Sequence, residues 1–471
     1  MKHISADICV IGAGSGGLSV AAGAAQMGAS VVLFEADKMG GDCLNTGCVP
    51  SKALLAAAKA AHYAKGAPPM GVAAHTPTLS FADAKAHVAS AIATIEPHDS
   101  IERFTSLGVT VINEAAQFTG PRTVASATHK VTARYVVVAT GSTALVPPIT
   151  GLDSVPYHTN ESIFSQPNCP DHLVIIGGGP IGVEMAQAHR RLGAKVTIIE
   201  AATIMGRDDP ELVALLRQSL TDDGITIYEG RSVTAVAGTE GALTVTLNDG
   251  QTIAASHILV AVGRQPNVAS LNLDAAQIAH SPTGIRTDAR LRTSNKRVFA
   301  IGDVTGRAQF THIAAYHAGI VIRNILFKLP AKLNETIEPR VTYCDPELAH
   351  VGIDEATASA QFGPDAIRVL RAPLSGNDRA IAEGKTHGMV KVTTHKNGRI
   401  LGASILAPAA GEMITAWTLA LSTKQKIASM ASLITPYPTY GDASKRAAGS
   451  FFTDKLFSSR TRAVVKFLMR F

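Results

Sequence analysis

Two segments of this chain follow the same plan: a short apolar run, a glycine-rich turn, a run of helix formers, and a second apolar run that ends in an acid. The first segment begins at Asp7 and reaches Glu35, and the second begins at His172 and reaches Glu200. Each acid lies 23 residues after the first glycine of its turn. An ordinary strand-to-helix turn can contain one such glycine pattern, but two copies with a strand before and an acid after indicate two dinucleotide-binding units.

The glycines of each turn have a physical task. They permit a tight turn and let the backbone approach a pyrophosphate at the N-terminus of the following helix. The acid can accept a hydrogen bond from a ribose hydroxyl, and a carboxylate at Glu200 repels the 2′-phosphate of NADP(H). The second unit is therefore predicted to prefer NAD(H). The glycines concerned are Gly12, Gly14 and Gly17 in the first turn and Gly177, Gly179 and Gly182 in the second.

Two later runs, residues 136–142 and 258–267, are rich in β-branched residues and contain a glycine turn. Each is predicted to be the strand that returns to close its nucleotide-binding domain. Asp303 follows a further short apolar run, where a carboxylate could hold the polyhydroxyl chain of a cofactor. Taken alone, Asp303 would be a solvated turn residue.

The chain has only five cysteines, and two of them, Cys43 and Cys48, stand five positions apart before a run of helix formers. The thiolate is the reactive form of cysteine, and helix N-termini and nearby cations favour it. Cys48 lies at a predicted helix start, with Lys52 one turn on. A zinc site would want two more Cys or His ligands at ordered spacing, so the pair is predicted to be a redox disulfide and no metal site is expected. Two buried thiols are the alternative.

Composition excludes several classes of function. The 471 residues are 46% hydrophobic and 17% charged, which suits a large core and about three domains. The net charge of +6 is mild and comes without a long basic run, so nucleic-acid binding is not expected. No apolar run reaches the roughly 18 residues of a membrane span, and no signal peptide precedes the first strand. The expected location is cytoplasmic, where a close cysteine pair is more often catalytic than structural.

In this order, the motifs resemble those of the pyridine nucleotide–disulfide oxidoreductases, the flavoprotein family that includes dihydrolipoamide dehydrogenase, glutathione reductase and mercuric reductase. The matching stretches are GAGSGG with Glu35, CLNTGCVPSK, ATGS, GGGPIGVE, FAIGD and YCDPELAHVG. The resemblance implies an α/β fold with two Rossmann-like dinucleotide-binding domains and a C-terminal α+β dimerisation domain. The expected domains are an FAD-binding domain in residues 1–150, an NAD(P)-binding domain in 151–268, the second part of the FAD or central domain in 269–334, and an interface domain in 335–471.

The same resemblance implies FAD in the first unit, NAD(P)H in the second, and a homodimer. Electrons would pass from nicotinamide to flavin and then to the cysteine pair, with Cys48 facing the flavin and Cys43 exchanging with the acceptor. Lys52 and Glu184 match an ion pair beside the flavin ring. The cofactor-binding positions carried over are Gly12, Gly14, Gly17, Glu35, Gly41, Thr140, Gly141, Asp303, Gly177, Gly179, Gly182, Glu200 and Gly263.

The chain departs from the family pattern in its C-terminal part. Tyr437 stands where disulfide reductases carry an acid–base histidine, and Asp442 stands where a glutamate follows it. A histidine exchanges protons near neutral pH, whereas a tyrosine, with a pKa of about 10, is a poor base. Either Tyr437 only packs in the interface while another group moves the proton, or the acceptor needs no such base.

The tyrosine pattern is more similar to that of mercuric reductase, which also carries a vicinal cysteine pair near its C-terminus. Here no cysteine follows Cys344, so "mercuric reductase-like" is the closer description. The acceptor is expected to be a small-molecule or protein disulfide, with a metal ion or a quinone as alternatives.

The last segment, residues 455–471, has an apolar and a basic stripe if it is helical. It is either a basic amphipathic helix on an anionic membrane surface or a terminal helix that packs on the dimer, and the sequence favours the second. The first would fit a membrane- or partner-associated redox module with low activity alone. The apolar stripe contains Phe457, Val464, Leu468 and Phe471, and the basic stripe contains Arg462, Lys466 and Arg470.

Overall fold

The computed structural model describes residues 1–66, 70 and 78–471, and the chain divides into two compact units. Unit 1 consists of Met1–Ala61, Pro77–Ala201 and Arg231–Asn334, and unit 2 consists of His62–Thr76, Ala202–Gly230 and Glu335–Phe471. Unit 2 thus includes Ala202–Gly230, a segment that the sequence groups with the NAD(P)-binding domain. The predicted domain limits stay a prediction.

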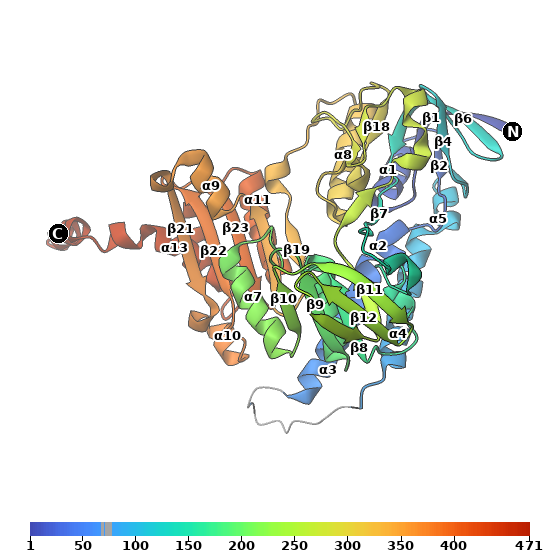
Figure 1. The fold of residues 1–471 in the computed structure, drawn as a ribbon. Helices are drawn as coiled ribbons and strands as arrows, with labels where there is room; N and C mark the ends of the chain where they lie inside the picture. Colours follow the sequence, from blue (N-terminus) through green and yellow to red (C-terminus); the bar gives the residue numbers. More distant parts are fainter. Residues whose placement is uncertain (67–69, 71–77) are drawn as a thin grey trace. The chain divides into compact units, whose positions relative to one another are not determined.

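The larger sheet of unit 1 has a parallel core (Figure 1). Strands β2 (Val31–Phe34), β1 (Lys2–Ile11) and β6 (His129–Val138) lie side by side and run parallel. β3 (Val109–Ile112) extends the sheet beyond β2, and β18 (Val298–Ala300) pairs with β6. Every residue of β2 is buried, as expected for a parallel strand that is covered on both faces.

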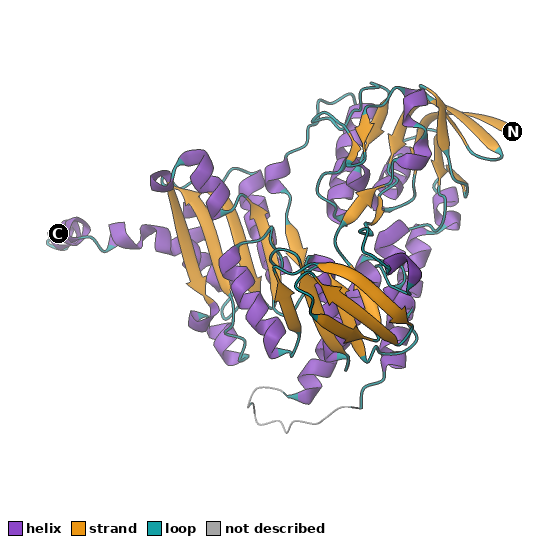
Figure 2. Ribbon diagram, in the orientation of Figure 1, coloured by secondary structure: helices purple, strands orange, loops and turns teal. Residues whose placement is uncertain are grey.

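Helices cover this sheet and supply its second layer (Figure 2). α1 (Ser15–Gln26) connects β1 to β2, and α8 (Thr311–Ile325) packs against α1. Their apolar faces join one core with the sheet, which includes Leu18, Val20 and Ile320. The predicted strand–turn–helix–strand unit at the N-terminus is confirmed.

The second nucleotide-binding unit repeats this arrangement. β8 (His172–Ile176) leads through a glycine turn into α6 (Pro180–Arg191) and on to β9 (Lys195–Glu200). β9, β8 and β14 (His257–Val260) are parallel neighbours. A three-stranded antiparallel sheet follows in the chain, made of β11 (Val233–Thr239), β12 (Ala242–Leu247) and β13 (Thr252–Ala255).

The two predicted returning strands are present as β6 and β14, and each ends before its glycine turn, as expected. β6 begins at His129, earlier than the predicted run, and ends at Val138, whereas β14 covers only His257–Val260. After the turns, β7 (Ser142–Ala144) and β15 (Arg264–Pro266) form a small antiparallel pair. The two turns are therefore tied to each other, which places residues from both runs at one location.

Unit 2 contains a five-stranded antiparallel sheet in the order β19–β20–β23–β22–β21. Helices α11 (Ala410–Ser422) and α13 (Gly441–Leu456) pack on it. Trp417 is fully buried between them and donates from Nε1 to Ser444 Oγ at 3.2 Å. The strands are β19 (Arg340–Thr342), β20 (Glu347–Gly352), β21 (Ile367–Pro373), β22 (Met389–His395) and β23 (Ile400–Ala407).

The remaining elements are short or peripheral. In unit 1 they are α2 (Gly41–Asn45), α4 (Phe81–Ile95), α5 (Ile101–Ser106), β4 (Gln117–Gly120), β5 (Thr123–Ala125), β16 (His280–Ser281) and β17 (Gly284–Ile285). In unit 2 they are α7 (Pro210–Asp222), β10 (Thr226–Glu229), α9 (Glu355–Phe362), α10 (Asp378–Ala382), α12 (Ile427–Ala431) and α14 (Ser459–Leu468). The chain of α3 (Cys48–Lys65) begins in unit 1 and ends in unit 2.

A buried histidine in the second nucleotide-binding unit makes stability depend on pH. His189 on α6 is fully buried, and desolvation lowers its pKa to about 4. Its ordinary pKa is about 6.5, so between these values the unfolded chain binds a proton that the folded chain does not. Stability is therefore complete above about pH 6.5 and falls as the pH drops toward 4, by at most about 1.4 kcal/mol per pH unit.

Denaturant unfolding at about pH 7.5 and about pH 5 should show this loss, and His189→Gln should reduce it. His87 on α4 is exposed, so His87→Gln serves as the matched control and should leave the pH dependence unchanged. Equal pH dependence in the wild type and in His189→Gln would contradict the assignment.

Candidate functional site

The first glycine turn is built from very close backbone contacts. Gly12 has a φ of +102°, and a side chain on Gly17 would overlap the carbonyl oxygen of Gly12. Gly14, at the N-terminus of α1, has no atom within 4 Å of the position that a Cβ would take. The turn therefore leaves an open cradle over the backbone amides of α1. Glu35 closes its other side, because Oε2 accepts a hydrogen bond from Ala13 N at 2.6 Å.

The second glycine turn repeats these contacts one by one. Gly177 has a φ of +110°, and a side chain on Gly182 would overlap the carbonyl oxygen of Gly177. Gly179 is open in the same way as Gly14. Glu200 Oε2 accepts from Gly178 N at 2.7 Å. Both cradles fit a pyrophosphate, since a helix N-terminus offers free amides and a favourable dipole.

Other predicted cofactor-binding residues are Gly41, which packs on the first glycine turn, and three residues in the turns after β6 and β14, namely Thr140, Gly141 and Gly263. Gly41 packs so closely on the first turn that a Cβ would be 2.8 Å from the Cα of Gly14. Thr140 Oγ1 donates to Asn267 O at 2.9 Å, which joins the turns after β6 and β15. Gly141, in the same turn as Thr140, has a φ of +66°, and Gly263, in the turn between β14 and β15, has a φ of +141°.

The predicted redox pair lies at two successive helix starts. Cys43 is half-buried in the short helix α2, and Cys48 is exposed as the first residue of α3. Both are free thiols. Thr311, the first residue of α8, places its hydroxyl oxygen 3.2 Å from Cys48 Sγ. This contact could not be predicted from the sequence, because 263 positions separate the two residues.

The environment separates the two thiols in acidity. A hydrogen bond from Cys43, with smaller effects of the Thr311 hydroxyl and the Lys52 charge, lowers the pKa of Cys48 to about 6 despite desolvation. The same hydrogen bond, together with burial, raises the pKa of Cys43. At neutral pH the reduced pair is therefore a thiolate at Cys48 and a thiol at Cys43. This is the distribution in which one sulfur is charged and the other keeps a proton for exchange.

An ion pair stands one turn further along α3. Lys52 Nζ lies 2.8 Å from Glu184 Oε2 on α6, and the Glu184 side chain is buried. The structure thus brings together two residues that the sequence could connect only through the family resemblance. From the sequence alone, Glu184 would be an ordinary helix residue.

A second charged cluster connects Asp42, next to Cys43, to Asp303, the acid that was predicted to hold the polyhydroxyl chain of a cofactor. Arg264 Nη2 lies 2.9 Å from Asp42 Oδ2, and its Nε lies 3.9 Å from Asp303 Oδ2. Ser142 donates to Asp303 at 2.6 Å, and desolvation raises the pKa of Asp303. Asn160 holds the other oxygen of Asp42 at 2.8 Å. Sequence reasoning missed both residues, although Asp42 directly precedes the CLNTGCVPSK stretch and Arg264 lies in the run 258–267.

Tyr437 and Asp442 belong to unit 2, and the structure gives them separate partners. The Tyr437 hydroxyl is exposed and donates to Asp378 Oδ2 at 2.8 Å, a bond that raises the pKa of Tyr437. Asp442 pairs with Arg446 at 2.7 Å. With a raised pKa, Tyr437 holds its proton even more firmly than a free tyrosine, so it is a donor and not a base.

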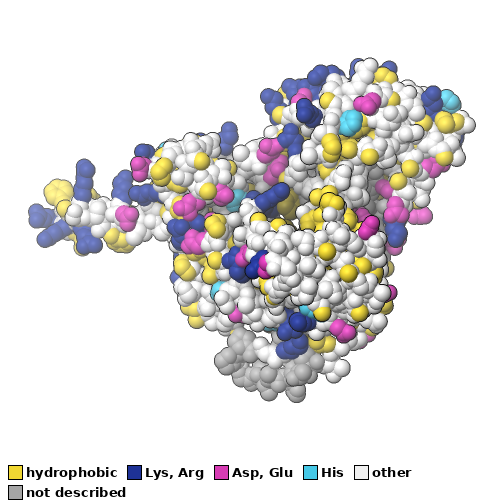
Figure 3. Space-filling model, viewed as in Figure 1, with side chains coloured by type: hydrophobic (Ala, Val, Ile, Leu, Met, Phe, Trp, Pro, Cys, Tyr) yellow, Lys and Arg dark blue, Asp and Glu magenta, His cyan; other side chains and the backbone are white. Residues whose placement is uncertain are grey.

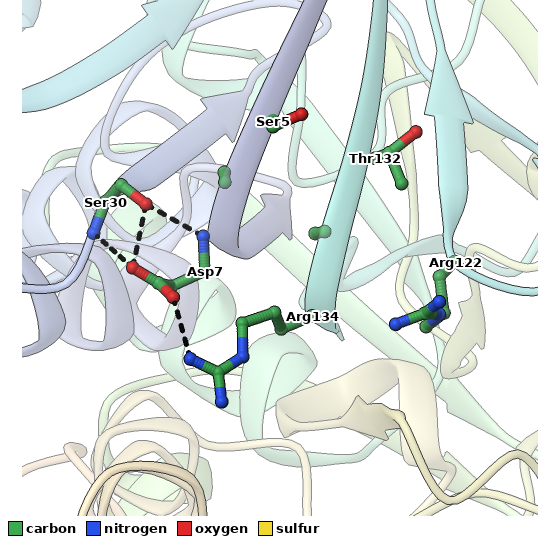
Figure 4. A pocket seen from close by; sticks show the side chains of 8 residues that line it. Ser5, Asp7, Ser30, Arg122, Thr132 and Arg134 are labelled. Atoms are coloured by element: carbon green, nitrogen blue, oxygen red, sulfur yellow. Dashed lines mark hydrogen bonds and ion pairs between the residues drawn. The ribbon is translucent and has the colours of Figure 1, made fainter.

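The hollow drawn in Figure 4 is unrelated to these groups. It measures about 340 Å³ and lies between β1 and β6, on the outer part of the main sheet. Asp7 is held there by the hydroxyl of Ser30 at 2.8 Å and by Arg134 at 3.3 Å, as Figure 4 shows. None of the site residues predicted from the sequence lines it, and its contacts fix the start of β2 against β1.

Outside 67–69 and 71–77, no three Cys, His, Asp or Glu side chains gather closely enough to hold a metal ion. Over the same residues, no helix combines the length and the apolar character that a membrane crossing requires.

Comparison with known proteins identifies the family. The model for pyridine nucleotide-disulphide oxidoreductases matches residues 6–318, and the model for the dimerisation domain of the same family matches residues 338–448. The chain belongs to the pyridine nucleotide-disulphide oxidoreductases. It is an FAD-dependent enzyme that uses a pyridine nucleotide, and its dimerisation domain supports a homodimer.

Proteins named as mercuric reductases align with almost the whole chain. It is 36% identical to mercuric reductase of Streptomyces lividans over 96% of this chain and 97% of that one, and 34% identical to mercuric reductase of Shigella flexneri over 95% and 81%. Among solved structures, the Cu(II) complex of the HOCl-induced flavoprotein disulfide reductase RclA from Escherichia coli has a TM-score of 0.84 at 27% identity, covering 93% of this chain and 98% of that one. LpdA from Mycobacterium tuberculosis has a TM-score of 0.86 at 25% identity, covering 96% and 99%. These likenesses confirm the α/β fold with two dinucleotide-binding domains and a C-terminal dimerisation domain.

The Lys52–Glu184 pair should contribute to stability and to the acidity of Cys48. Lys52→Met removes a cation that lowers the pKa of Cys48 and leaves the buried carboxylate without this partner. We expect a loss of about 1–2 kcal/mol in unfolding free energy, less than for a fully buried pair because Lys52 is partly exposed. Alkylation of Cys48 should also need a higher pH.

The double variant Lys52→Met/Glu184→Gln is the control for the ion pair. It should recover part of the lost stability, because no carboxylate is then left in the buried position. Additive losses in the double variant would show that the two side chains do not act as a pair.

Proposed function

We propose that this chain passes electrons from a pyridine nucleotide through FAD to the Cys43–Cys48 disulfide and on to an acceptor at Cys43. The observation that carries the proposal is the Cys48 thiol, which starts α3, touches Thr311 and has a pKa of about 6. Bound FAD would accept a hydride equivalent from the nucleotide and supply an electron pair to the disulfide. Lys52 and Glu184 would fix the charge around this centre.

The two cradles support the cofactor positions. In the proposal the first cradle, with Asp303 beside it, holds FAD, and the second holds the nicotinamide nucleotide. The residues for FAD are Gly12, Gly14, Gly17, Glu35, Gly41, Thr140, Gly141 and Asp303, and those for the nucleotide are Gly177, Gly179, Gly182, Glu200 and Gly263.

NAD(H) is the proposed nucleotide. Glu200 stands at the end of β9 with its carboxylate against the second turn, where it would accept from a free 2′-hydroxyl and repel a 2′-phosphate. The proposed location is cytoplasmic, a reducing compartment in which a dithiol of this kind is kept active.

The proposed acceptor is a small-molecule or protein disulfide. The Cys43 thiolate would attack one acceptor sulfur, which forms a mixed disulfide and releases the other sulfur as a thiolate that takes up a proton. Cys48 would then attack Cys43, which restores the Cys43–Cys48 disulfide and releases the second acceptor sulfur as a thiolate that is also protonated. Tyr437 cannot serve as the base that frees the Cys43 thiolate, because its hydrogen bond to Asp378 raises its pKa. Cys48 shares a hydrogen bond with Cys43, but its pKa of about 6 makes its thiolate a weak base for a thiol whose pKa is raised, so water or another residue would take the proton.

A metal ion is the second candidate acceptor, and two observations favour it. Reduction of a metal ion by an electron pair needs no proton for a leaving thiol, so the loss of the histidine matters less. The relatives include mercuric reductases, and one structural neighbour is a Cu(II) complex. A quinone is a third acceptor to be tested.

The test is an acceptor screen on the purified, FAD-loaded protein, with NADH and NADPH compared as donors. We expect faster turnover with NADH, and anaerobic reduction should produce a thiolate-to-flavin charge-transfer band. Cys48→Ser should abolish that band, and Cys43→Ser should keep the band but stop transfer to a disulfide. A charge-transfer band that persists in Cys48→Ser would contradict the proposed relay.

The same screen separates the two acceptor classes. Tyr437→Phe should change disulfide turnover by less than about threefold if Tyr437 is not the proton carrier, and Tyr437→His should raise it if a base is missing. Fast wild-type turnover of disulfides without improvement in Tyr437→His would show that the base is not missing. Turnover with Hg²⁺ or Cu²⁺ alone would favour the metal ion.

The C-terminal tail, residues 455–471, is proposed to contact an anionic membrane surface. No residue of α14 is buried, and Phe457, Leu468 and Phe471 are 65%, 61% and 97% exposed. Figure 3 shows Lys and Arg side chains gathered on this terminal segment. The tail has five cations and no acid, so two copies repel each other, whereas anionic lipids attract it.

Flotation with vesicles of anionic lipid tests this contact. The full chain should float with anionic vesicles but not with neutral ones, and a chain ending at residue 454 should float with neither. Equal behaviour of the two chains on anionic vesicles would overturn the proposal. A shift from dimer to monomer in the shortened chain would assign the tail to a second copy instead.

A further inference from the structure

The structure places the hydroxyl of Thr311 beside the Cys48 sulfur. The two atoms are 3.2 Å apart, within reach of an O–H···S hydrogen bond. The same hydroxyl also interacts with Cys43, where it opposes the rise in that thiol's pKa. One side chain from a distant segment therefore serves both sulfurs of the pair.

The position of Thr311 explains why its hydroxyl is available. In the interior of a helix, a threonine hydroxyl often bonds to the carbonyl three or four residues earlier. Thr311 is the first residue of α8, so no earlier helical turn offers such a carbonyl. Its β-branched side chain also has few rotamers, which holds the hydroxyl in a fixed direction.

We propose that Thr311 is a positioning residue that donates a hydrogen bond to the Cys48 thiolate and thereby favours the reduced state of the pair. The inference rests on the proposed relay. Reduction of the disulfide breaks the S–S bond and takes up two electrons and one proton. It leaves a thiol at Cys43 and a thiolate at Cys48. The two electrons come from NAD(P)H, and the proton comes from the same reduction or from water.

The hydrogen bond acts on only one side of this equilibrium. A thiolate is a stronger acceptor than a disulfide sulfur, because hydrogen bonds to ionised groups are stronger than those to neutral ones. Thr311 thus stabilises the reduced pair more than the oxidised pair. Lys52 acts in the same direction through its charge, so Thr311 must be separated from it by a change that keeps all charges.

Thr311→Val meets that condition, since it replaces the hydroxyl by a methyl group of similar shape. In the reduced, FAD-loaded protein, the pH midpoint for alkylation of Cys48 by iodoacetamide, followed by peptide mass spectrometry, should rise by about one unit, a tenfold change. The reduction potential of the pair against a dithiothreitol buffer should fall by about 30 mV, which is the same tenfold change for a two-electron couple. The charge-transfer band should shift to higher pH in parallel.

Three further variants make the result specific. Thr311→Ser keeps the hydroxyl and should stay within about 0.3 unit of the wild type, since only the methyl group is lost. Thr311→Ala removes the hydroxyl without adding a methyl group in its place, so it should agree with Thr311→Val even if the valine disturbs folding. Thr418→Val changes a threonine on α11 of unit 2, where the hydroxyl bonds Ile414 O, and should have no effect.

The outcomes distinguish this inference from the proposed function. If NADH fails to release two alkylatable thiols at Cys43 and Cys48 in the wild type, the relay itself fails. If the wild type releases them but Thr311→Val and Thr311→Ala leave both midpoint and potential unchanged, only the role of Thr311 is overturned. Equal shifts in Thr311→Ser and Thr311→Val would mean that packing, and not the hydroxyl, matters.

Discussion

The close contact between backbone atoms in the two glycine turns is the constraint on which the site depends. Because Gly17 and Gly182 each lie against a carbonyl oxygen of their own turn, helices α1 and α6 start at the carboxyl ends of their strands with open amides. A single methyl group at either glycine would push strand and helix apart. The segment that carries the two cysteines packs on the first of these turns through Gly41, so such a displacement would move the cysteines as well.

Sequence patterns predicted the parts of this protein that depend on neighbours along the chain. The two glycine turns, their strands and the acids Glu35 and Glu200 follow from local spacing, and the structure confirms the elements. The contacts between distant segments did not follow in the same way: Thr311 with Cys48, and Arg264 with Asp42, depend on how separate strands and helices assemble. A threonine after a phenylalanine and an arginine after a glycine carry no signal until the fold brings a sulfur or a carboxylate beside them.

The two sulfurs differ in acidity although they share two neighbours. The Thr311 hydroxyl lowers and the Asp42 charge raises the pKa of both thiols. The Lys52 charge lowers the pKa of Cys48, and Asp42 is itself held by Arg264 and Asn160. In the proposed relay, Cys48 is therefore the sulfur that holds the negative charge. On the outward side, the tyrosine hydroxyl at position 437 is bonded to an acid. Because a tyrosine bonded to an acid is a poor base, an acceptor whose reduction needs no base suits this site as well as a disulfide does.

Glu35 and Glu200 each hold the amide of the turn that they face, and this has a consequence for how a nucleotide enters. A carboxylate has about four lone-pair sites, so it can keep this bond and still receive ribose hydroxyls. The turn is then closed before any ligand arrives, and the entropy of ordering it has been spent in folding. Binding energy that a flexible loop would lose to ordering is then left for affinity.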